Sequence, residues 1–235
     1  MSTQCRTRAH GRSVCKALVI GIMVSLAPLS AGASVGAMAR PARPVVLETQ
    51  TAVLAGGCFW GVEAVFEHVK GVRSVIAGYA GGEAATASYA RVGTGRTGHA
   101  EAVQVVFEPQ TISYAEVLRI FFSVAHDPTQ LNRQGPDIGS QYRSAIFYAD
   151  ESQRELANGY IRQLSQAHLF RAPIVTSVDA LRGFYPAESH HQDFIARNPT
   201  DPYVVVNDLP KILHLKRLFP ESYREWNAPT TYTSL

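Results

Sequence analysis

Residues 51–63 read TAVLAGGCFWGVE, and this stretch decides the fold. Its first five residues form a short apolar run that predicts a buried strand. Two glycines then lead to Cys58, and four apolar residues recur after it at helical spacing: Val62, Val65, Phe66 and Val69. The pattern therefore predicts a strand, a tight glycine turn and a helix, with a cysteine at the first turn of the helix.

Cys58 lies at a position that is expected to change the pKa of its thiol. The first turn of a helix offers unpaired N–H groups and the positive end of the helix dipole. Both favour a thiolate, so we expect the pKa of Cys58 to lie below that of a free cysteine. A buried cysteine at a tight turn is the simpler alternative. The glycines, the helix start and the neighbouring Phe59 and Trp60 favour a nucleophile.

The first 39 residues have the pattern of a secretory signal peptide. Four basic and no acidic residues precede an uncharged apolar run over 17–27, and small residues follow up to Ala37-Met38-Ala39. This order is typical of export signals, and the apolar run is short for a membrane span. We expect cleavage after Ala39, with Ala33 as a second candidate, and a periplasmic or secreted protein that keeps no membrane span.

Removal of this leader changes the composition of the chain. The net charge falls from +3 to −1, because the leader holds four basic residues. A nearly neutral chain is not expected to bind nucleic acid. Cys5 and Cys15 also leave, so Cys58 is the only cysteine of the mature chain and no internal disulfide is possible. The remaining residues, 40–235, suit one domain with a substantial core.

The rest of the chain alternates between strand and helix patterns. We expect strands at residues 72–79, 101–107, 145–148 and 174–177, and helices from Ser113, over 151–168 with Leu156 inward, and over 210–219. Long loops cover residues 80–98 and 126–143. This order predicts a two-layer α/β sandwich of the split βαβ, or ferredoxin-like, type with long loops.

The glycine-rich loop contains a literal G-x-G-x-x-G at residues 93–98. A dinucleotide-binding fingerprint follows a strand and opens a helix, whereas this match precedes a strand. We therefore interpret it as a loop over the active site. Tyr89 stands in it among small residues.

Glu101 begins a strand with period-two alternation and shares its face with Val103, Val105 and Phe107. A carboxyl at the head of an apolar face loses water, so its pKa is expected to rise. A solvated strand end is the alternative. His190 and His191 lie near two acidic residues, but their spacing does not match a zinc motif, and we expect no metal.

Four stretches stand in a fixed order along the chain: Gly57–Gly61, Gly98–Val103, Asp137–Ser144 and His191–Phe194. Together they resemble the motifs of the peptide-methionine (S)-S-oxide reductases, the A-type methionine sulfoxide reductases. The resemblance runs from about Thr51 to about Tyr223. It implies an α/β two-layer sandwich, and an enzyme that reduces free and protein-bound methionine S-sulfoxide and repairs oxidised exported proteins.

The resemblance also implies roles for single residues. Cys58 would attack the sulfoxide sulfur and become a sulfenic acid. Glu101 would protonate the sulfoxide oxygen, which requires a carboxyl that is neutral near neutral pH.

The remaining roles concern binding. Tyr89 and Tyr142 would donate hydrogen bonds to the sulfoxide oxygen, and Asp137 would orient the polar side of the site. Phe59 and Trp60 would form the apolar pocket for the S-methyl group.

The chain departs from the commoner family pattern after Cys58, because no cysteine follows it up to Leu235. Many members carry resolving cysteines near the C-terminus. Residues 203–211, YVVVNDLPK, resemble the single-cysteine members instead. We therefore expect no bound cofactor and an external thiol reductant: thioredoxin, glutaredoxin or a small thiol. We also expect a monomer.

Three other functions would fit parts of the pattern. A single-cysteine thiol peroxidase needs the same activated thiol but has no use for Phe59 and Trp60 beside it. A Cys–His hydrolase needs a histidine base that the pattern does not assign. A non-catalytic protein that binds methionine-rich partners would not need a reactive Cys58.

Overall fold

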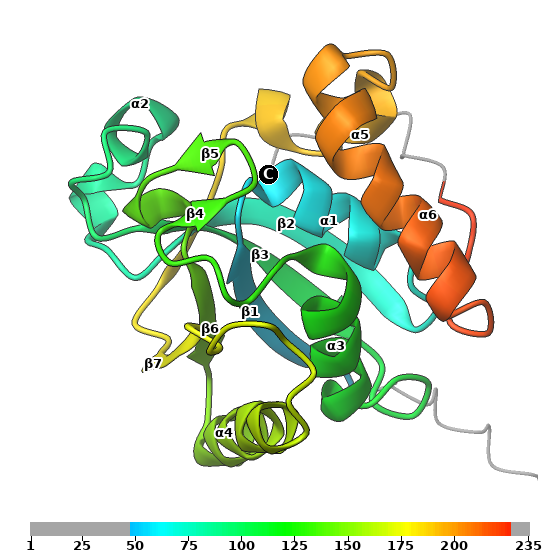
Figure 1. Cartoon of the computed structure of the whole chain (residues 1–235). Helices are drawn as coiled ribbons and strands as arrows, with labels where there is room; N and C mark the ends of the chain where they lie inside the picture. Colours follow the sequence, from blue (N-terminus) through cyan, green and yellow to red (C-terminus); the bar gives the residue numbers. More distant parts are fainter. Residues whose placement is uncertain (1–47, 227–235) are drawn as a thin grey trace, which may run out of the picture. The chain divides into compact units, whose positions relative to one another are not determined.

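The structure is a computed structural model, and it describes residues 48–226 (Figure 1). The predicted signal peptide, residues 1–39, lies outside this part. The described residues form a mixed α/β fold around one six-stranded sheet with the order β7-β6-β1-β3-β2-β8. Neighbouring strands are antiparallel, except that β6 and β7 are parallel.

Four predicted strands are confirmed at the centre of this sheet. The six strands are β1 (Gln50–Gly56), β2 (Val72–Ala80), β3 (Ala100–Phe107), β6 (Ser144–Tyr148), β7 (Ser177–Ala180) and β8 (Phe184–Pro186). A separate two-stranded ribbon consists of β4 (Arg133–Gln134) and β5 (Asp137–Ile138). The ribbon lies within the region that was expected to be a long loop.

The helices are of two kinds. The longer ones are α1 (Phe59–Glu67), α3 (Tyr114–Ile120), α4 (Glu151–Gln166) and α6 (Leu209–Leu218); π-helical turns extend α3 as η2 (Phe121–Ala125) and precede α6 as η5 (Val204–Asp208). Short turns are η1 (Ala84–Thr86), α2 (Tyr89–Val92), η3 (Ser140–Tyr142), η4 (Ser189–His191) and α5 (Phe194–Arg197). Ser113 caps α3 through a reciprocal capping box with Glu116, as its sequence predicts.

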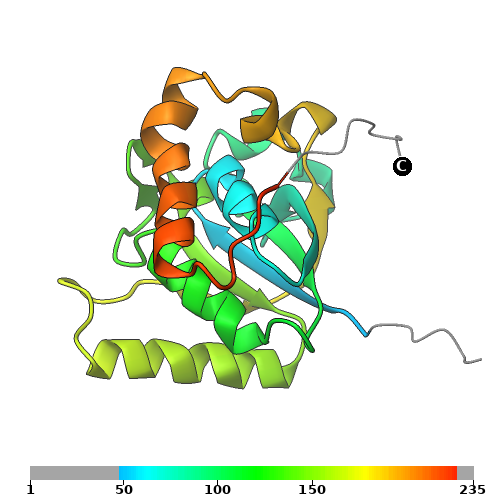
Figure 2. The same cartoon turned by 90° about the vertical axis from the view of Figure 1, so that its right-hand side faces the viewer.

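The alternation along β1 places its side chains on two different faces of the sheet. Ala52 and Leu54 belong to the main core, which includes buried residues of α1, α3, α4 and α6. Val53 and Ala55 belong to a smaller cluster built mostly from alanines. The apolar stripe predicted for α1 is buried along its whole length. Figure 2 shows α3 against α4 beside the sheet.

Two expectations about individual elements are wrong. The last predicted strand begins three residues late, at Ser177, because the backbone of Val175 bonds to Pro128 instead of to β6. Leu156 is 48% exposed, whereas Ala157 and Leu164 are buried. The inner face of α4 follows the four-three spacing through Ala157, and Leu156 lies about 100° away from it on the helix.

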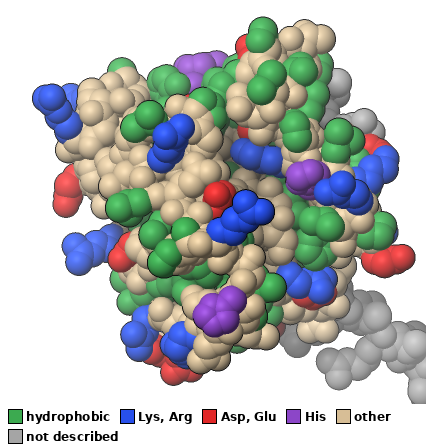
Figure 3. Space-filling model, viewed as in Figure 1, with side chains coloured by type: hydrophobic (Ala, Val, Ile, Leu, Met, Phe, Trp, Pro, Cys, Tyr) green, Lys and Arg blue, Asp and Glu red, His purple; other side chains and the backbone are tan. Residues whose placement is uncertain are grey.

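The surface of the described residues carries charges of both signs. Figure 3 shows Lys and Arg interspersed with Asp and Glu, and apolar side chains gathered over α5 and α6. The exposed apolar residues of η5 and α6 are Val205, Val206, Leu213 and Leu218. Within residues 48–226, no helix combines the length and the apolar character that crossing a membrane requires.

Candidate active site

Cys58 is the N-cap residue of α1, and only Gly57 separates it from the end of β1. Gly57 has φ of +94°, and a side chain there would meet Gln134 of the β4–β5 ribbon. Glycine is therefore required for the turn that delivers the thiol. Cys58 is 8% exposed, and its side chain forms no capping hydrogen bond at the start of the helix. The predicted strand–turn–helix placement of Cys58 is confirmed.

The predicted fall in the pKa of Cys58 is wrong for this structure. Burial raises the pKa of the thiol well above its ordinary value, and negative charge on Glu101 and Asp208 adds to the rise. The Trp60 N–H and the Lys211 ammonium act in the opposite direction but are smaller effects. One N–H group at the helix start does not replace the water that the buried thiolate loses.

Glu101 is buried and its pKa is raised, as the alternation of its strand predicts. Its carboxyl is 2% exposed, and its Oε2 accepts the backbone N–H of Phe59 at 3.1 Å. Burial raises the pKa of Glu101 to about 8, although the Phe59 N–H opposes the rise. The carboxyl beside Cys58 is therefore largely protonated at neutral pH and can donate a proton.

Two loops bring Tyr89 and Tyr142 towards this carboxyl. Three groups of the segment 140–143 donate to backbone carbonyls of the glycine-rich loop: Gln141 Nε2 to Gly93, Ser140 Oγ to Gly95, and Arg143 Nη2 to Gly98. Burial raises the pKa of both tyrosines, and the charges of Glu101 and Cys58 contribute to each rise. Both phenols therefore stay protonated as hydrogen-bond donors near the thiol.

The G-x-G-x-x-G segment thus supplies the backbone carbonyls that accept hydrogen bonds from the segment 140–143. It precedes β3, as the sequence indicates, and opens no helix of its own. Tyr89 is held separately, because its backbone N–H donates to Glu188 at 3.0 Å. The tyrosine ring is 39% exposed and forms part of the rim of the site.

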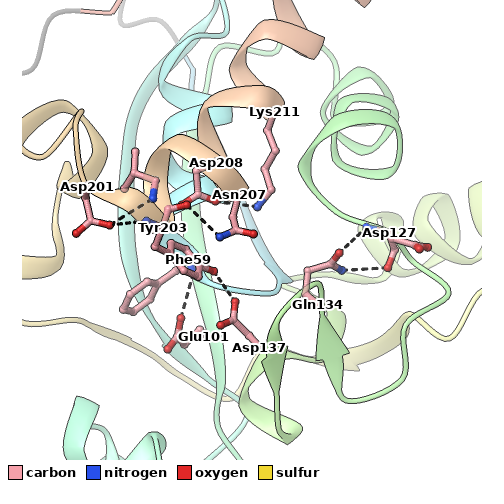
Figure 4. Close-up of polar contacts among 11 residues, drawn as sticks. Phe59, Glu101, Asp127, Gln134, Asp137, Asp201, Tyr203, Asn207, Asp208 and Lys211 are labelled. Carbon is pink, nitrogen blue, oxygen red and sulfur yellow. Dashed lines mark hydrogen bonds and ion pairs between the residues drawn. The ribbon is translucent and has the colours of Figure 1, made fainter.

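Asp137 lies on β5 and has a partner that sequence patterns did not assign. The phenol of Tyr203 donates to Asp137 Oδ2, across 66 residues of chain (Figure 4). Tyr203 begins the segment 203–211 that was associated with the single-cysteine form. The structure therefore joins this segment to the polar side of the site.

Phe59 and Trp60 have different surroundings. Phe59 is 1% exposed and packs against Tyr79 and His191, with ring centroids 5.9 and 5.3 Å apart. Trp60 is partly exposed and stacks on Phe194, with centroids 3.6 Å apart. Trp60 therefore offers aromatic surface at the site, while Phe59 lies beneath it in the core.

A partly buried ion pair lies on the C-terminal side of the site. Lys211 Nζ lies 3.0 Å from Asp208 Oδ1, and the Asp208 side chain is fully buried. A side chain at position 61 would collide with Asp208 Oδ1, so the pair packs on the first turn of α1 through Gly61. Both charges act on Cys58. In the described part of the chain, no group of three or more His, Cys, Asp or Glu side chains could hold a metal.

Comparison with known proteins shows the family of the chain. The family model "Peptide methionine sulfoxide reductase" matches residues 50–222. The chain belongs to the peptide methionine sulfoxide reductase family. It is an oxidoreductase of that family, and the reaction of the family is the reduction of methionine sulfoxide.

Relatives of the peptide methionine sulfoxide reductase family cover most of the described chain. The chain is 55% identical over 177 residues to peptide methionine sulfoxide reductase MsrA 2 of Mesorhizobium japonicum, covering 75% of this chain and 91% of the relative. It is 51% identical over 185 residues to MsrA 2 of Synechocystis sp., covering 79% and 86%. Reduced Mxr1 from Saccharomyces cerevisiae has a similar structure, with a TM-score of 0.60, 32% identity, and coverage of 65% of this chain and 87% of Mxr1.

Four site residues of this reductase were missed from the sequence or left without a role. Tyr203, Asp208 and Lys211 come from the C-terminal segment, and His191 comes from η4. Their only signal in the sequence was that they lie in residues 203–211 or in the stretch His191–Phe194, both of which resemble the family. Tyr203 contacts Asp137 across 66 residues of chain and His191 contacts Trp60 across 131, which local patterns do not reveal.

Proposed function

We propose that the chain reduces methionine S-sulfoxide, free or protein-bound, through a sulfenic acid on Cys58. The observation that carries this proposal is the pairing of Cys58 with Glu101 at the first turn of α1. Glu101 accepts the N–H of the residue after the nucleophile, and its pKa of about 8 supplies a neutral acid. A nucleophile beside a protonated carboxyl suits removal of an oxygen from sulfur.

In the proposed reaction the Cys58 sulfur bonds to the sulfoxide sulfur while Glu101 donates its proton to the oxygen. Transfer of the resulting hydroxyl to the Cys58 sulfur breaks the bond between the two sulfurs. Methionine leaves with its sulfur reduced by two electrons, and Cys58 is oxidised by two electrons to the sulfenic acid. The proton lost by the thiol replaces the one that Glu101 gave.

The surrounding residues bind the substrate in this proposal. Tyr89 and Tyr142 donate hydrogen bonds to the sulfoxide oxygen, and Asp137 orients the polar side of the site through Tyr203. Trp60 offers the apolar surface that accepts the S-methyl group, and Phe59 supports it from beneath. The raised pKa of Cys58 means that the resting thiol is neutral and loses its proton during the reaction.

Regeneration needs an external thiol, because Cys58 is the only cysteine after residue 15. One thiol attacks the sulfenic acid and releases water, and a second thiol cleaves the mixed disulfide to restore Cys58. Thioredoxin, glutaredoxin and a small thiol are the candidate reductants, with no bound cofactor. The signal peptide predicted over residues 1–39 supports action on oxidised exported proteins in the periplasm or outside the cell.

The strand order also supports the finer fold class. The central strands β6-β1-β3-β2, with α1 between β1 and β2 and α3 between β3 and β6 in the chain, suit a two-layer sandwich of split βαβ type. Strands β7 and β8 add one edge each.

The test is a single turnover without added thiol, using each epimer of a methionine sulfoxide peptide beside Cys58→Ser. The proposal predicts one equivalent of methionine from the S epimer, none from the control, and a sulfenic acid on the Cys58 peptide by mass spectrometry. A disulfide between Cys58 and Cys5 or Cys15 would contradict the end point. Methionine from neither epimer, with rapid consumption of hydrogen peroxide, would favour the thiol peroxidase.

A further inference from the structure

Trp60 is held by three rings from the C-terminal part of the chain. Phe194 stacks on it with an interplanar angle of 7°, and Tyr203 meets it edge-on at 85° with centroids 6.0 Å apart. His191 lies at 5.8 Å, inclined by 28°. These contacts restrict the tilt of the indole plane but give little resistance to rotation within that plane.

One contact of Trp60 is directional. The indole Nε1–H donates to His191 Nδ1, with 3.3 Å between the nitrogens. An indole has a single hydrogen-bonding group, so its one donor fixes where the ring edge points. The hydrogen bond therefore supplies the in-plane orientation that stacking leaves free.

His191 is itself placed to transmit this orientation to the site. It is 4% exposed, and its ring lies 4.3 Å from that of Tyr89 and 5.3 Å from that of Phe59. Because Nδ1 accepts, the proton of the neutral ring is on Nε2, which has no hydrogen-bond partner among the described residues. The contact with Trp60 is thus the hydrogen bond that orients the imidazole.

We propose that His191 is a positioning residue that fixes the in-plane orientation of Trp60 and thereby shapes the wall that receives the S-methyl group. The assignment of the wall rests on the proposed function, whereas the His191–Trp60 contact does not. The role requires Nδ1 to be free of a proton.

The surroundings of His191 support the neutral ring. Burial lowers the pKa of His191 below its ordinary value, and the neighbouring His190 acts in the same direction. The titratable or charged groups that face it are His190, Glu188, Arg197, Tyr89 and, through Tyr89 and Phe59, the Cys58–Glu101 pair. As the pH falls through this lowered pKa, Nδ1 gains a proton and can no longer accept the indole N–H.

The test uses Trp60 as its own reporter. The chain has two tryptophans, so a Trp226→Phe background leaves Trp60 alone. In it, His191→Phe keeps an aromatic ring but removes the acceptor, and His191→Asn keeps an acceptor near the position of Nδ1. His190→Phe is the matched control, because His190 is exposed and has no hydrogen bond to Trp60.

Two readouts are measured on the full chain: the Trp60 emission spectrum and the separate KM and kcat for a methionine sulfoxide peptide. We expect His191→Phe to shift the emission and to raise KM about three- to tenfold, with kcat changed less than about twofold, the effect of one lost hydrogen bond. His191→Asn and His190→Phe should stay close to the background protein. The background emission should also change on acidification, and that change should be absent in His191→Asn.

Three results would overturn the inference: unchanged emission and KM in His191→Phe, equal losses in His191→Asn and His191→Phe, or an acid transition that persists in His191→Asn. Thermal unfolding shows whether His191→Phe folds. If it does not, His191→Asn and the acid titration decide. A chain that reduces neither epimer would contradict the proposed function, and the emission spectra would still decide the His191–Trp60 contact.

Discussion

Two groups of buried carboxyls lie at or on α1, and they differ in what surrounds them. Glu101 meets the start of the helix, next to Cys58. Glu63 and Glu67 lie one turn apart on the helix itself, beside Asp193 at the N-cap of α5. All four side chains are at most 4% exposed. The same physical effect, loss of water around a carboxylate, acts on both groups.

The consequences differ because the neighbours differ. Burial raises the pKa of Glu63 to about 8 and that of Glu67 to about 10, and the neighbouring carboxyls, Asp193 among them, add to each rise. These groups face one another and two arginines, Arg197 and Arg224. Glu101 instead faces a thiol and the partly exposed Tyr89. A raised pKa therefore serves catalysis only where a nucleophile and a path for substrate meet it.

The strongest way to break this comparison is to remove one acid from each group. Glu101→Gln should slow single-turnover reduction of the S epimer by about 10²–10⁴-fold, the usual contribution of a general acid. Glu67→Gln should leave the rate within about twofold, because its carboxyl faces no reacting atom. Stopped-flow methionine formation measures both. Equal rates for the Glu101→Gln variant and the unmodified chain would remove the distinction.

The second effect is on stability. Here Glu67, and not Glu101, is expected to have the larger influence. The folded pKa of Glu67, about 10, lies above its ordinary value of 4.5. Its contribution to the free energy of unfolding is therefore complete below about pH 4.5 and is lost as pH rises towards about 10. The loss approaches about 1.4 kcal/mol per pH unit for each carboxyl that holds its proton only when folded.

Glu67→Gln cannot ionise, so its stability should fall less steeply with pH than that of the unmodified chain. Urea unfolding at several values between pH 6 and 9 measures the two slopes. Parallel curves would show that Glu67 does not retain its proton in the folded state. Glu101→Gln should make the free energy of unfolding fall less steeply with pH only up to about pH 8.

The smallest effect concerns the pKa of the Cys58 thiol at the start of α1. Negative charge on Glu101 raises the pKa of Cys58, and the Lys211 ammonium lowers it. Glu101→Gln should therefore lower the midpoint of Cys58 alkylation with pH, and Lys211→Gln should raise it. Mass spectrometry of the Cys58 peptide gives the rate at each pH. Shifts of the same sign in both variants would contradict this account of the charges.

Local pattern predicted much of the fold and the chemical core of the site. The apolar run before Gly56 and the helical stripe after Cys58 placed Cys58 at the start of a helix, because both signals lie within twenty residues. The period-two alternation after Glu101 predicted its burial and the direction of its pKa shift.

What local pattern could not predict depends on distant parts of the chain. The pKa of Cys58 is set by how deeply other segments bury it, Asp208 among them, and not by the helix start alone. The acidic cluster needs Asp193 brought to α1, and Trp60 needs His191 from 131 residues away. β7 begins later than expected because Val175 bonds to a loop carbonyl.

The central claim is that Glu101 is a neutral carboxylic acid at neutral pH. The most direct measurement is an infrared titration of the carboxyl stretch, taken as the difference between the unmodified chain and Glu101→Gln, so that Glu63 and Glu67 cancel. The account predicts a protonated carboxyl in that difference at pH 7, which disappears with a midpoint of about 8. A carboxylate already present at pH 6, with a midpoint near the ordinary value of a glutamate, would contradict it.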